Sequence, residues 1–180
     1  MRIKRENTFG LVIDIQERLF PVMYEKENLL KNNLILIKGL NTLEIPIIVT
    51  QQYTKGLGGT IKNIKFEIKD FKPVEKKDFS CCDEAFFIEK IKELKATNII
   101  ICGIESHVCV LQTAVDLKEA GLNPIVVLDC ISSRKEKDLL FAIERFRIEG
   151  IMMASYESIL FELTRSANSS EFKSISKLVK

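Results

Sequence analysis

Short apolar runs alternate with longer segments of helical period along the chain. The apolar runs predict six strands, at 9–15, 46–50, 74–79, 98–104, 124–129 and 151–155. The segments between and after them predict helices at 28–43, 84–95, 107–120, 135–149 and 156–165. Glycines mark a loop at 55–60, and the tail at 172–179 is weakly amphipathic.

Two of the predicted strands, through residues 99–101 and 125–128, are apolar on both faces. Strands that are covered by helices on both sides need this pattern, whereas half-exposed strands alternate. The order of elements therefore predicts an α/β fold of three layers, α/β/α, with a six-stranded parallel sheet in the middle. The commonest strand order is 3-2-1-4-5-6, and ligands bind outside the carboxyl ends of strands 1 and 4. We expect one domain over residues 1–180.

Charge and cysteine content narrow the classes of function. The 27 Lys and Arg nearly balance 25 Asp and Glu, so bulk electrostatics gives no basis for binding nucleic acid. A single histidine, His107, excludes sites that need two or three imidazoles. Five irregularly spaced cysteines predict free thiols in a cytoplasmic protein. No run approaches the ~20 apolar residues of a membrane span or resembles a signal peptide, so no membrane partner is expected.

Two polar residues stand near the carboxyl ends of predicted strands 1 and 4. Asp14 interrupts an apolar run, and a buried carboxylate is costly unless it is paired or hydrogen-bonded. Cys109 falls in the first turn of the next helix, with Ser106 as its N-cap, where free N–H groups and the helix dipole favour a thiolate. The alternatives are an aspartate that caps a local turn and a cysteine that only fills core space.

The segment 75–80 offers a cation for such a site, in Lys76 and Lys77. A lysine beside the thiol lowers the thiol pKa from about 8.5 towards neutrality and keeps the carboxylate ionised. The third strand lies two positions from the first, roughly 10 Å away at ~4.8 Å per strand, so the lysine must reach inward on its long stem or from a bent loop. The alternative is that both lysines are solvated surface charges.

These residues lie in segments that resemble the isochorismatase-like cysteine hydrolases, a superfamily that includes nicotinamidases and N-carbamoylsarcosine amidohydrolase. The resemblance covers nearly the whole chain. It is carried by LVIDIQ at 11–16, VTQQY at 49–53, KGLGGT at 55–60, EKKDFS at 75–80, GIESHVCVLQTA at 103–114, DCISSR at 129–134 and LFEL at 160–163. A metal-free branch of "isochorismatase domain-containing" proteins is similar to this chain in the segments at 49–53, 55–60, 129–134 and 160–163.

The resemblance implies a catalytic triad of Asp14, Lys76 and Cys109. Lys76 matches the family lysine because it stands four residues before the serine that corresponds to Ser80. The implied activity is hydrolysis of a small amide or a related substrate through an acyl-enzyme on Cys109. Two alternatives stay open: a non-catalytic or redox-sensing scaffold that keeps the fold, and a purely structural ion pair. The resemblance and the apolar helices 107–120 and 135–149 also suggest a homo-oligomer, a dimer or larger.

The family also implies a cis peptide bond between Ile104 and Glu105, with the backbone N–H groups of Glu105 and Cys109 forming an oxyanion hole. Nicotinamidases bind a metal through an aspartate and two histidines after strand 2. This chain has no histidine there, so we expect neither a metal nor another cofactor. Relatives often read Thr-Glu-Gln where this chain has Gln51, and that change removes one negative charge.

Four residues that follow the first two strands are candidates for the wall of a substrate pocket. They are Gln16, Phe20, Gln52 and Tyr53, of which the two aromatic residues suit an ordinary core equally well. His107 is a poor base for Cys109, because side chains two positions apart diverge on a helix. We expect His107 at the rim of the site or at a subunit interface.

Overall fold

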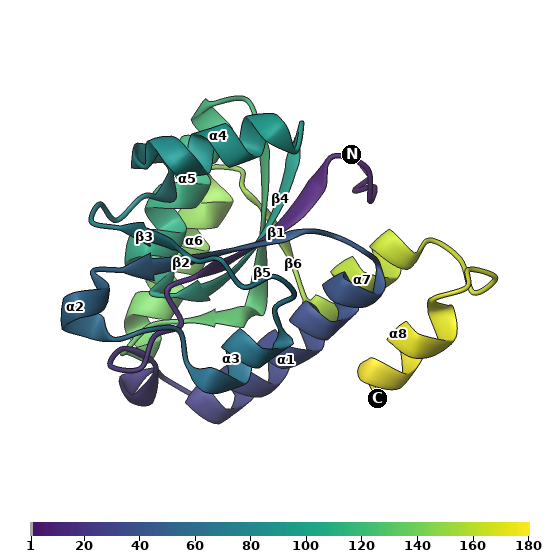
Figure 1. The fold of residues 1–180 in the computed structure, drawn as a ribbon, viewed down its shortest axis with the longest axis horizontal. Coiled ribbons are helices and arrows are strands. Elements are labelled where there is room, and N and C mark those ends of the chain that lie inside the picture. The colour runs from purple at the N-terminus through teal and green to yellow at the C-terminus, as the bar shows by residue number, and fades with distance from the viewer. Residues whose placement is uncertain (1) are drawn as a thin grey trace.

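A single parallel sheet organises the protein (Figure 1). The computed structural model describes residues 2–180, so Met1, the first residue of the predicted domain, lies outside the described residues. The strand order β3-β2-β1-β4-β5-β6 confirms the prediction, and every neighbouring pair is parallel. The strands are β1 (Thr8–Ile13), β2 (Ile47–Gln52), β3 (Val74–Lys76), β4 (Asn98–Ile104), β5 (Asn123–Ser132) and β6 (Met152–Ala154).

Helices cover both faces of the sheet, as the doubly apolar strands require. One face carries α1 (Lys26–Thr42), α3 (Lys62–Glu67), α7 (Tyr156–Thr164) and α8 (Phe172–Leu178), whose apolar side chains share one core cluster. The other face carries α4 (Ala85–Glu93), α5 (Leu111–Glu119) and α6 (Glu136–Ile148), which share a second cluster. Figure 1 shows these two groups on opposite sides of the strands.

Several boundaries differ from the prediction for local reasons. The first strand ends at Ile13, because Asp14 has a positive φ of 51° and turns the chain out of the sheet. The third strand has only three residues. The predicted loop at 55–60 is partly helical, since α2 spans Thr54–Leu57, and α3 was not predicted at all.

The register of the sheet brings the strand ends of interest to one edge. Ile13 of β1 pairs with Gly103 of β4, and Gln52 of β2 pairs with Lys76 of β3. Because all strands are parallel, the residues at and just beyond these pairs meet at the carboxyl edge of the sheet. The fold therefore places segments far apart in sequence around one point.

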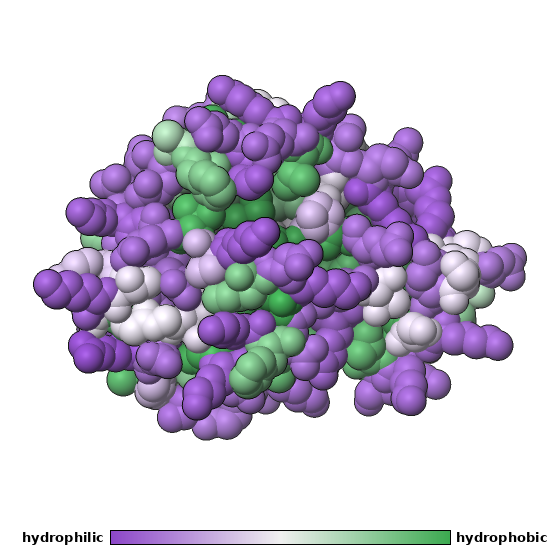
Figure 2. All heavy atoms as spheres, viewed as in Figure 1, coloured by the Kyte–Doolittle hydropathy of each residue, from purple (hydrophilic) through white to green (hydrophobic). Residues whose placement is uncertain are grey.

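The surface mixes apolar and charged side chains. On the face seen in Figure 2, apolar side chains appear in small groups between hydrophilic ones. Three large apolar residues of α6 are exposed: Leu140, Phe141 and Ile148, with 53%, 69% and 79% of their surface accessible. No helix within residues 2–180 is long and apolar enough to cross a lipid bilayer.

Candidate active site

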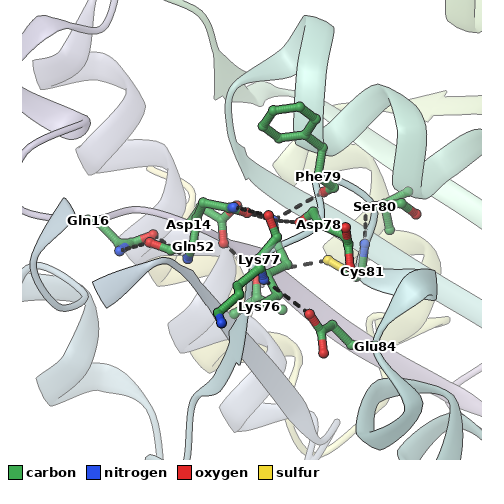
Figure 3. Close-up of polar contacts among 12 residues, drawn as sticks. Asp14, Gln16, Gln52, Lys76, Lys77, Asp78, Phe79, Ser80, Cys81 and Glu84 are labelled. Atoms are coloured by element: carbon green, nitrogen blue, oxygen red, sulfur yellow. Dashed lines mark hydrogen bonds and ion pairs between the residues drawn. The ribbon is translucent and has the colours of Figure 1, made fainter. Parts of the chain in front are cut away.

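A buried ion pair lies at the carboxyl edge of the sheet. The Nζ atom of Lys76 is 2.8 Å from Oδ2 of Asp14, and both side chains are completely buried. Lys76 ends β3 and Asp14 follows β1, so the lysine side chain spans the width of β2, as the sequence required (Figure 3). Lys77, the neighbouring cation, is exposed.

The two oxygens of the Asp14 carboxylate have different partners. Oδ1 accepts a 2.8 Å hydrogen bond from the hydroxyl of Thr50, at the middle of β2. Oδ2 faces the Lys76 ammonium at 2.8 Å. A carboxylate oxygen has two lone pairs, so Oδ2 can accept a proton from a neighbouring donor while it faces the ammonium.

Lys76 is surrounded by acceptors. Its ammonium donates to Oε1 of Gln52 at 2.6 Å and to the backbone carbonyls of Asp78 and Phe79, each at 3.1 Å. Burial acts to lower the pKa of Lys76, but the Asp14 carboxylate, with help from the nearby cysteines, outweighs it and raises that pKa above its ordinary value. Lys76 is therefore a fixed cation at neutral pH.

Cys109 lies beside this ion pair, in a single π-helical turn that spans Ser106–Val110 between β4 and α5. Only 7% of its surface is accessible. Burial raises the pKa of the Cys109 thiol to about 12; the Asp14 carboxylate adds to the increase, and the Lys76 ammonium opposes it. The expectation of a lowered thiol pKa is therefore wrong for the resting site, because desolvation outweighs the single cation.

The turn before Cys109 also differs from the prediction. Glu105, rather than Ser106, is the N-cap, and its carbonyl accepts from the N–H groups of Val108 and Val110. The Ser106 hydroxyl is buried and has no hydrogen-bond partner within residues 2–180. The peptide bond between Ile104 and Glu105 is cis. The backbone N–H and the Nε of Arg134 both donate hydrogen bonds to the Glu105 carboxylate, each at 3.1 Å.

Gln16 and Gln52 lie at this edge of the sheet but bind other parts of the chain. Gln16 is fully buried, and its amide contacts the backbone of Gln52 and the carbonyl of Gly58. The Gln52 side chain lies between the Lys76 ammonium and the carbonyl of Lys77. Both N–H donors of Gln16 are occupied, which leaves no donor for the predicted contact with substrate.

The two aromatic candidates have different surroundings. Phe20 is half-buried and packs against Met23 and Leu29, so its ring belongs at least partly to the core. Tyr53 directly follows β2 and is 48% exposed, with its backbone N–H bound to the carbonyl of Lys76. Tyr53 is therefore the only one of the four predicted wall residues whose side chain is largely open to solvent.

His107 sits on the turn that carries Cys109 but is engaged elsewhere. Its Nδ1 atom is 2.9 Å from the hydroxyl of Ser133, and its Nε2 atom is 3.9 Å from a carboxylate oxygen of Asp138. These contacts tie the turn to the end of β5 and the start of α6. The side chain is 27% exposed, and its position at the rim of the site stays a prediction.

The amide of Gln51 is bound within the chain. Its Nε2 atom donates a 2.8 Å hydrogen bond to the hydroxyl of Thr60, in the segment after α2. A glutamate at this position would accept a hydrogen bond from the same hydroxyl. Glutamine and glutamate can therefore both bind this hydroxyl, with donor and acceptor exchanged.

Sequence reasoning missed two residues of the site. Thr50 binds Asp14, and Cys81 is a fully buried thiol whose Sγ lies 4.0 Å from the Thr50 hydroxyl. Burial raises the pKa of Cys81 to about 12. The sequence offered a signal for Thr50, because this polar residue stands near the carboxyl end of an apolar predicted strand, as Asp14 does. The sequence offered no signal for Cys81, because it begins a short 3-10 helix, Cys81–Asp83, that only the fold brings to this edge.

No three His, Cys, Asp or Glu side chains within the described part of the chain lie together as a metal site needs. The arrangement that is present is a carboxylate, an ammonium and a thiol in one buried cluster. Such a set defines a candidate site for nucleophilic chemistry.

Comparison with known proteins identifies the family. The isochorismatase domain model matches residues 8–158, and the chain belongs to the isochorismatase family. It is 34% identical to isochorismatase domain-containing protein 2 of Danio rerio, over 99% of this chain and 89% of that protein. It is 35% identical to isochorismatase family protein 1B of Dictyostelium discoideum, with the same coverage of both chains.

Solved structures agree with this assignment. A protein described as MAR1 ribonuclease from Caenorhabditis elegans superposes with a TM-score of 0.94, at 36% identity over 99% of this chain and 92% of that one. YcaC from Escherichia coli, described as an octameric hydrolase of unknown specificity, has a TM-score of 0.92 at 21% identity, over 99% and 89% of the two chains. The latter likeness concerns the fold alone.

Proposed function

We propose that this protein is a cysteine-dependent hydrolase of a small amide or related substrate. Cys109 is the nucleophile, Asp14 the proton acceptor and Lys76 the fixed cation of the site. The observation that carries the proposal is the completely buried ion pair between Asp14 and Lys76, 2.8 Å apart, beside the buried Cys109 thiol. A buried carboxylate–ammonium pair is costly for stability, and functional sites are where such pairs recur.

The first half of the reaction forms an acyl-enzyme. The Cys109 thiol is neutral in the resting site, so its proton passes to Asp14 as the sulfur attacks the substrate carbonyl. Lys76 stabilises the negative charge while it moves from the carboxylate to the sulfur and then to the carbonyl oxygen. The leaving group departs with the proton from Asp14, and the acyl group stays on the sulfur.

The second half returns the enzyme to its resting form. Asp14 takes a proton from water as the water oxygen attacks the thioester carbon. The carbon–sulfur bond breaks, the acid product leaves, and the proton on Asp14 returns to the sulfur of Cys109. We assign the oxyanion hole to the backbone N–H groups of Glu105 and Cys109. In support, the Glu105 N–H donates no hydrogen bond within residues 2–180.

The decisive experiment is a burst assay with a panel of amides and activated esters, comparing the wild type with Cys109→Ala. We expect the wild type to release one equivalent of leaving group rapidly and to carry the acyl group on Cys109 by mass spectrometry. Cys109→Ala should lose turnover and labelling. Cys82→Ala is the matched control, because Cys82 is a half-buried thiol on a different segment. Hydrolysis retained in Cys109→Ala would refute the assignment.

The same panel separates the two alternatives. A redox-sensing scaffold would react with peroxide at Cys109 but give no burst with any ester or amide. A purely structural ion pair would give neither reaction. RNA belongs in the panel because the nematode relative carries the name ribonuclease, although the net charge of +2 gives little bulk attraction to a polyanion.

We further propose that copies of the chain associate through the exposed apolar face of α6. Leu140, Phe141 and Ile148 lie along one side of this helix, and large exposed apolar groups mark interaction surfaces. Light scattering after size exclusion tests the proposal: Phe141→Lys should shift the protein to a smaller species. An unchanged mass would exclude this face.

We place the protein in the cytoplasm, where thiols stay reduced, and all five cysteines are unpaired.

A further inference from the structure

Two glutamines connect the ends of three strands around the ion pair (Figure 3). Gln16, two residues after Asp14, binds both backbone polar groups of Gln52: its Oε1 accepts from the N–H at 2.7 Å, and its Nε2 donates to the C=O at 2.9 Å. The side chain of Gln52 then accepts a 2.6 Å hydrogen bond from the ammonium of Lys76. The contacts close a ring from β1 through β2 to β3 and back through the Lys76–Asp14 ion pair.

We propose that Gln52 is a positioning residue that holds the Lys76 ammonium against Asp14 and beside Cys109, and that Gln16 is the clamp that holds Gln52. The inference rests on the proposed function, because it explains how the cation of that site is kept in place. Neither glutamine needs to touch the substrate for this role.

The partners of Lys76 show why Gln52 matters. Within residues 2–180, Asp14 and Gln52 are the two side chains that bind the ammonium through oxygen. The other oxygen partners are the carbonyls of Asp78 and Phe79, two and three residues further along its own segment. Gln52 is therefore the contact that ties the ammonium to β2. It is also the shortest of the four contacts.

The orientation of the Gln52 amide is determined by its neighbours. Its Oε1 must face the Lys76 ammonium, which has only donors, and its Nε2 donates to the carbonyl of Lys77 at 2.6 Å. Reversing the amide would place donor against donor and acceptor against acceptor. Gln16 is equally constrained, since its second N–H donates to the carbonyl of Gly58 at 2.7 Å.

The charges around the thiol link this geometry to a measurable quantity. The groups that act on Cys109 are the Asp14 carboxylate and the Lys76 ammonium, and those that act on Lys76 are Asp14, Cys109 and Cys81. If the ammonium loses its anchor on β2, its stabilisation of the Cys109 thiolate weakens. The pH at which Cys109 becomes reactive should then rise.

The test is the rate of Cys109 alkylation by iodoacetamide at several pH values, resolved by peptide mass spectrometry. Gln52→Met should shift the rate profile to higher pH by about one unit, so that labelling at pH 8 is about tenfold slower. Lys76→Met removes the cation completely, so its profile shows the shift that full loss of the ammonium causes. Gln51→Met is the matched control, because this buried neighbour donates to Thr60 and does not bind Lys76. It should lower the melting temperature without moving the profile.

A second pair of variants keeps the test decisive if Gln52→Met does not fold. Gln52→Glu places a second anion on the ammonium, whereas Gln51→Glu places the same charge one residue away. We expect Gln52→Glu to shift the alkylation profile of Cys109 to higher pH by more than Gln51→Glu does. Gln16→Met should shift the profile in the same direction as Gln52→Met, by a smaller amount.

The outcomes separate this inference from the proposed function. If wild-type Cys109 does not react, or if Lys76→Met leaves the profile unchanged, the proposed arrangement of thiol and cation fails. If Lys76→Met shifts the profile but the Gln52 variants behave like their Gln51 counterparts, the positioning role of Gln52 is overturned and the proposed function stands.

Discussion

The two ends of the sheet are built on opposite principles. At the amino end, neutral side chains bind one another: Asn98 donates to the Thr8 hydroxyl at 3.2 Å, and Asn123 donates to Asn98 at 3.2 Å. Thr8 in turn donates to the carbonyl of Lys4 at 2.6 Å. At the carboxyl end, a buried carboxylate meets a buried ammonium.

This contrast separates scaffold from site. Neutral, mutually satisfied polar groups hold strands in register with little desolvation cost. Buried charges are costly for the stability of a fold, and they are retained where chemistry needs them. Changes at the two ends should therefore differ in their effects on stability and on Cys109.

The largest effect should come from breaking the ion pair at the carboxyl end. Lys76→Met leaves the Asp14 carboxylate buried without its cation, and we expect about 3–5 kcal/mol of lost unfolding free energy. Urea denaturation measures the loss. The double variant Asp14→Leu with Lys76→Met should recover much of the stability but none of the reactivity of Cys109. A double variant as unstable as the single one would contradict this account.

A smaller loss is expected from Gly103, where β4 approaches β1 near the site. Gly103 has a φ of 119°, and an added Cβ would lie 2.1 Å from the backbone oxygen of Ile13. Gly103→Ala should therefore destabilise the fold by about 3 kcal/mol, because the backbone itself has to move. Gly121→Ala is the matched control, since it also has positive φ but nothing within 4 Å of its added Cβ. Equal losses from the two variants would exclude the close approach as the cause.

The amino end should respond more weakly. Thr8→Val removes the donor to Lys4 and the acceptor of Asn98, and we expect a loss of about 1–2 kcal/mol. The rate profile for alkylation of Cys109 should not move. A shifted profile would show that the two ends of the sheet are coupled, against the separation described above.

The smallest effect is a dependence of stability on alkaline pH. Burial raises the pKa of Cys102, in the middle of β4, from an ordinary value near 9 to about 12. A raised pKa in the folded state means that the contribution of this thiol is complete below about pH 9 and is lost as pH rises towards 12. Unfolding free energies at pH 8 and 10 should differ by about 1 kcal/mol more in the wild type than in Cys102→Ala. If the change in unfolding free energy between pH 8 and pH 10 is the same in both proteins, the raised pKa of Cys102 is contradicted.

The pattern of the sequence anticipated much of the fold because burial on both faces leaves a clear signature in the central strands. Elements with weak patterns were harder: the three-residue β3 carries charges, and α3 is too short to show a period. Of the site, the partnership of Asp14 and Lys76 was accessible through the motifs that surround them. The bonding of Gln16 and Gln52 was not, because a glutamine looks the same in sequence whether it binds a ligand or the chain.

By itself, the sequence indicated the parallel sheet between helices, because strands that are apolar on both faces need such cover. Its motifs indicated the family and, through the resemblance to that family, the pairing of Asp14 with Lys76. Only the tertiary structure decided the protonation of Cys109 and the partners of Lys76. Both depend on how much water is excluded and on which carbonyl, amide or hydroxyl group stands within about 3 Å, and these quantities arise only when distant segments pack together.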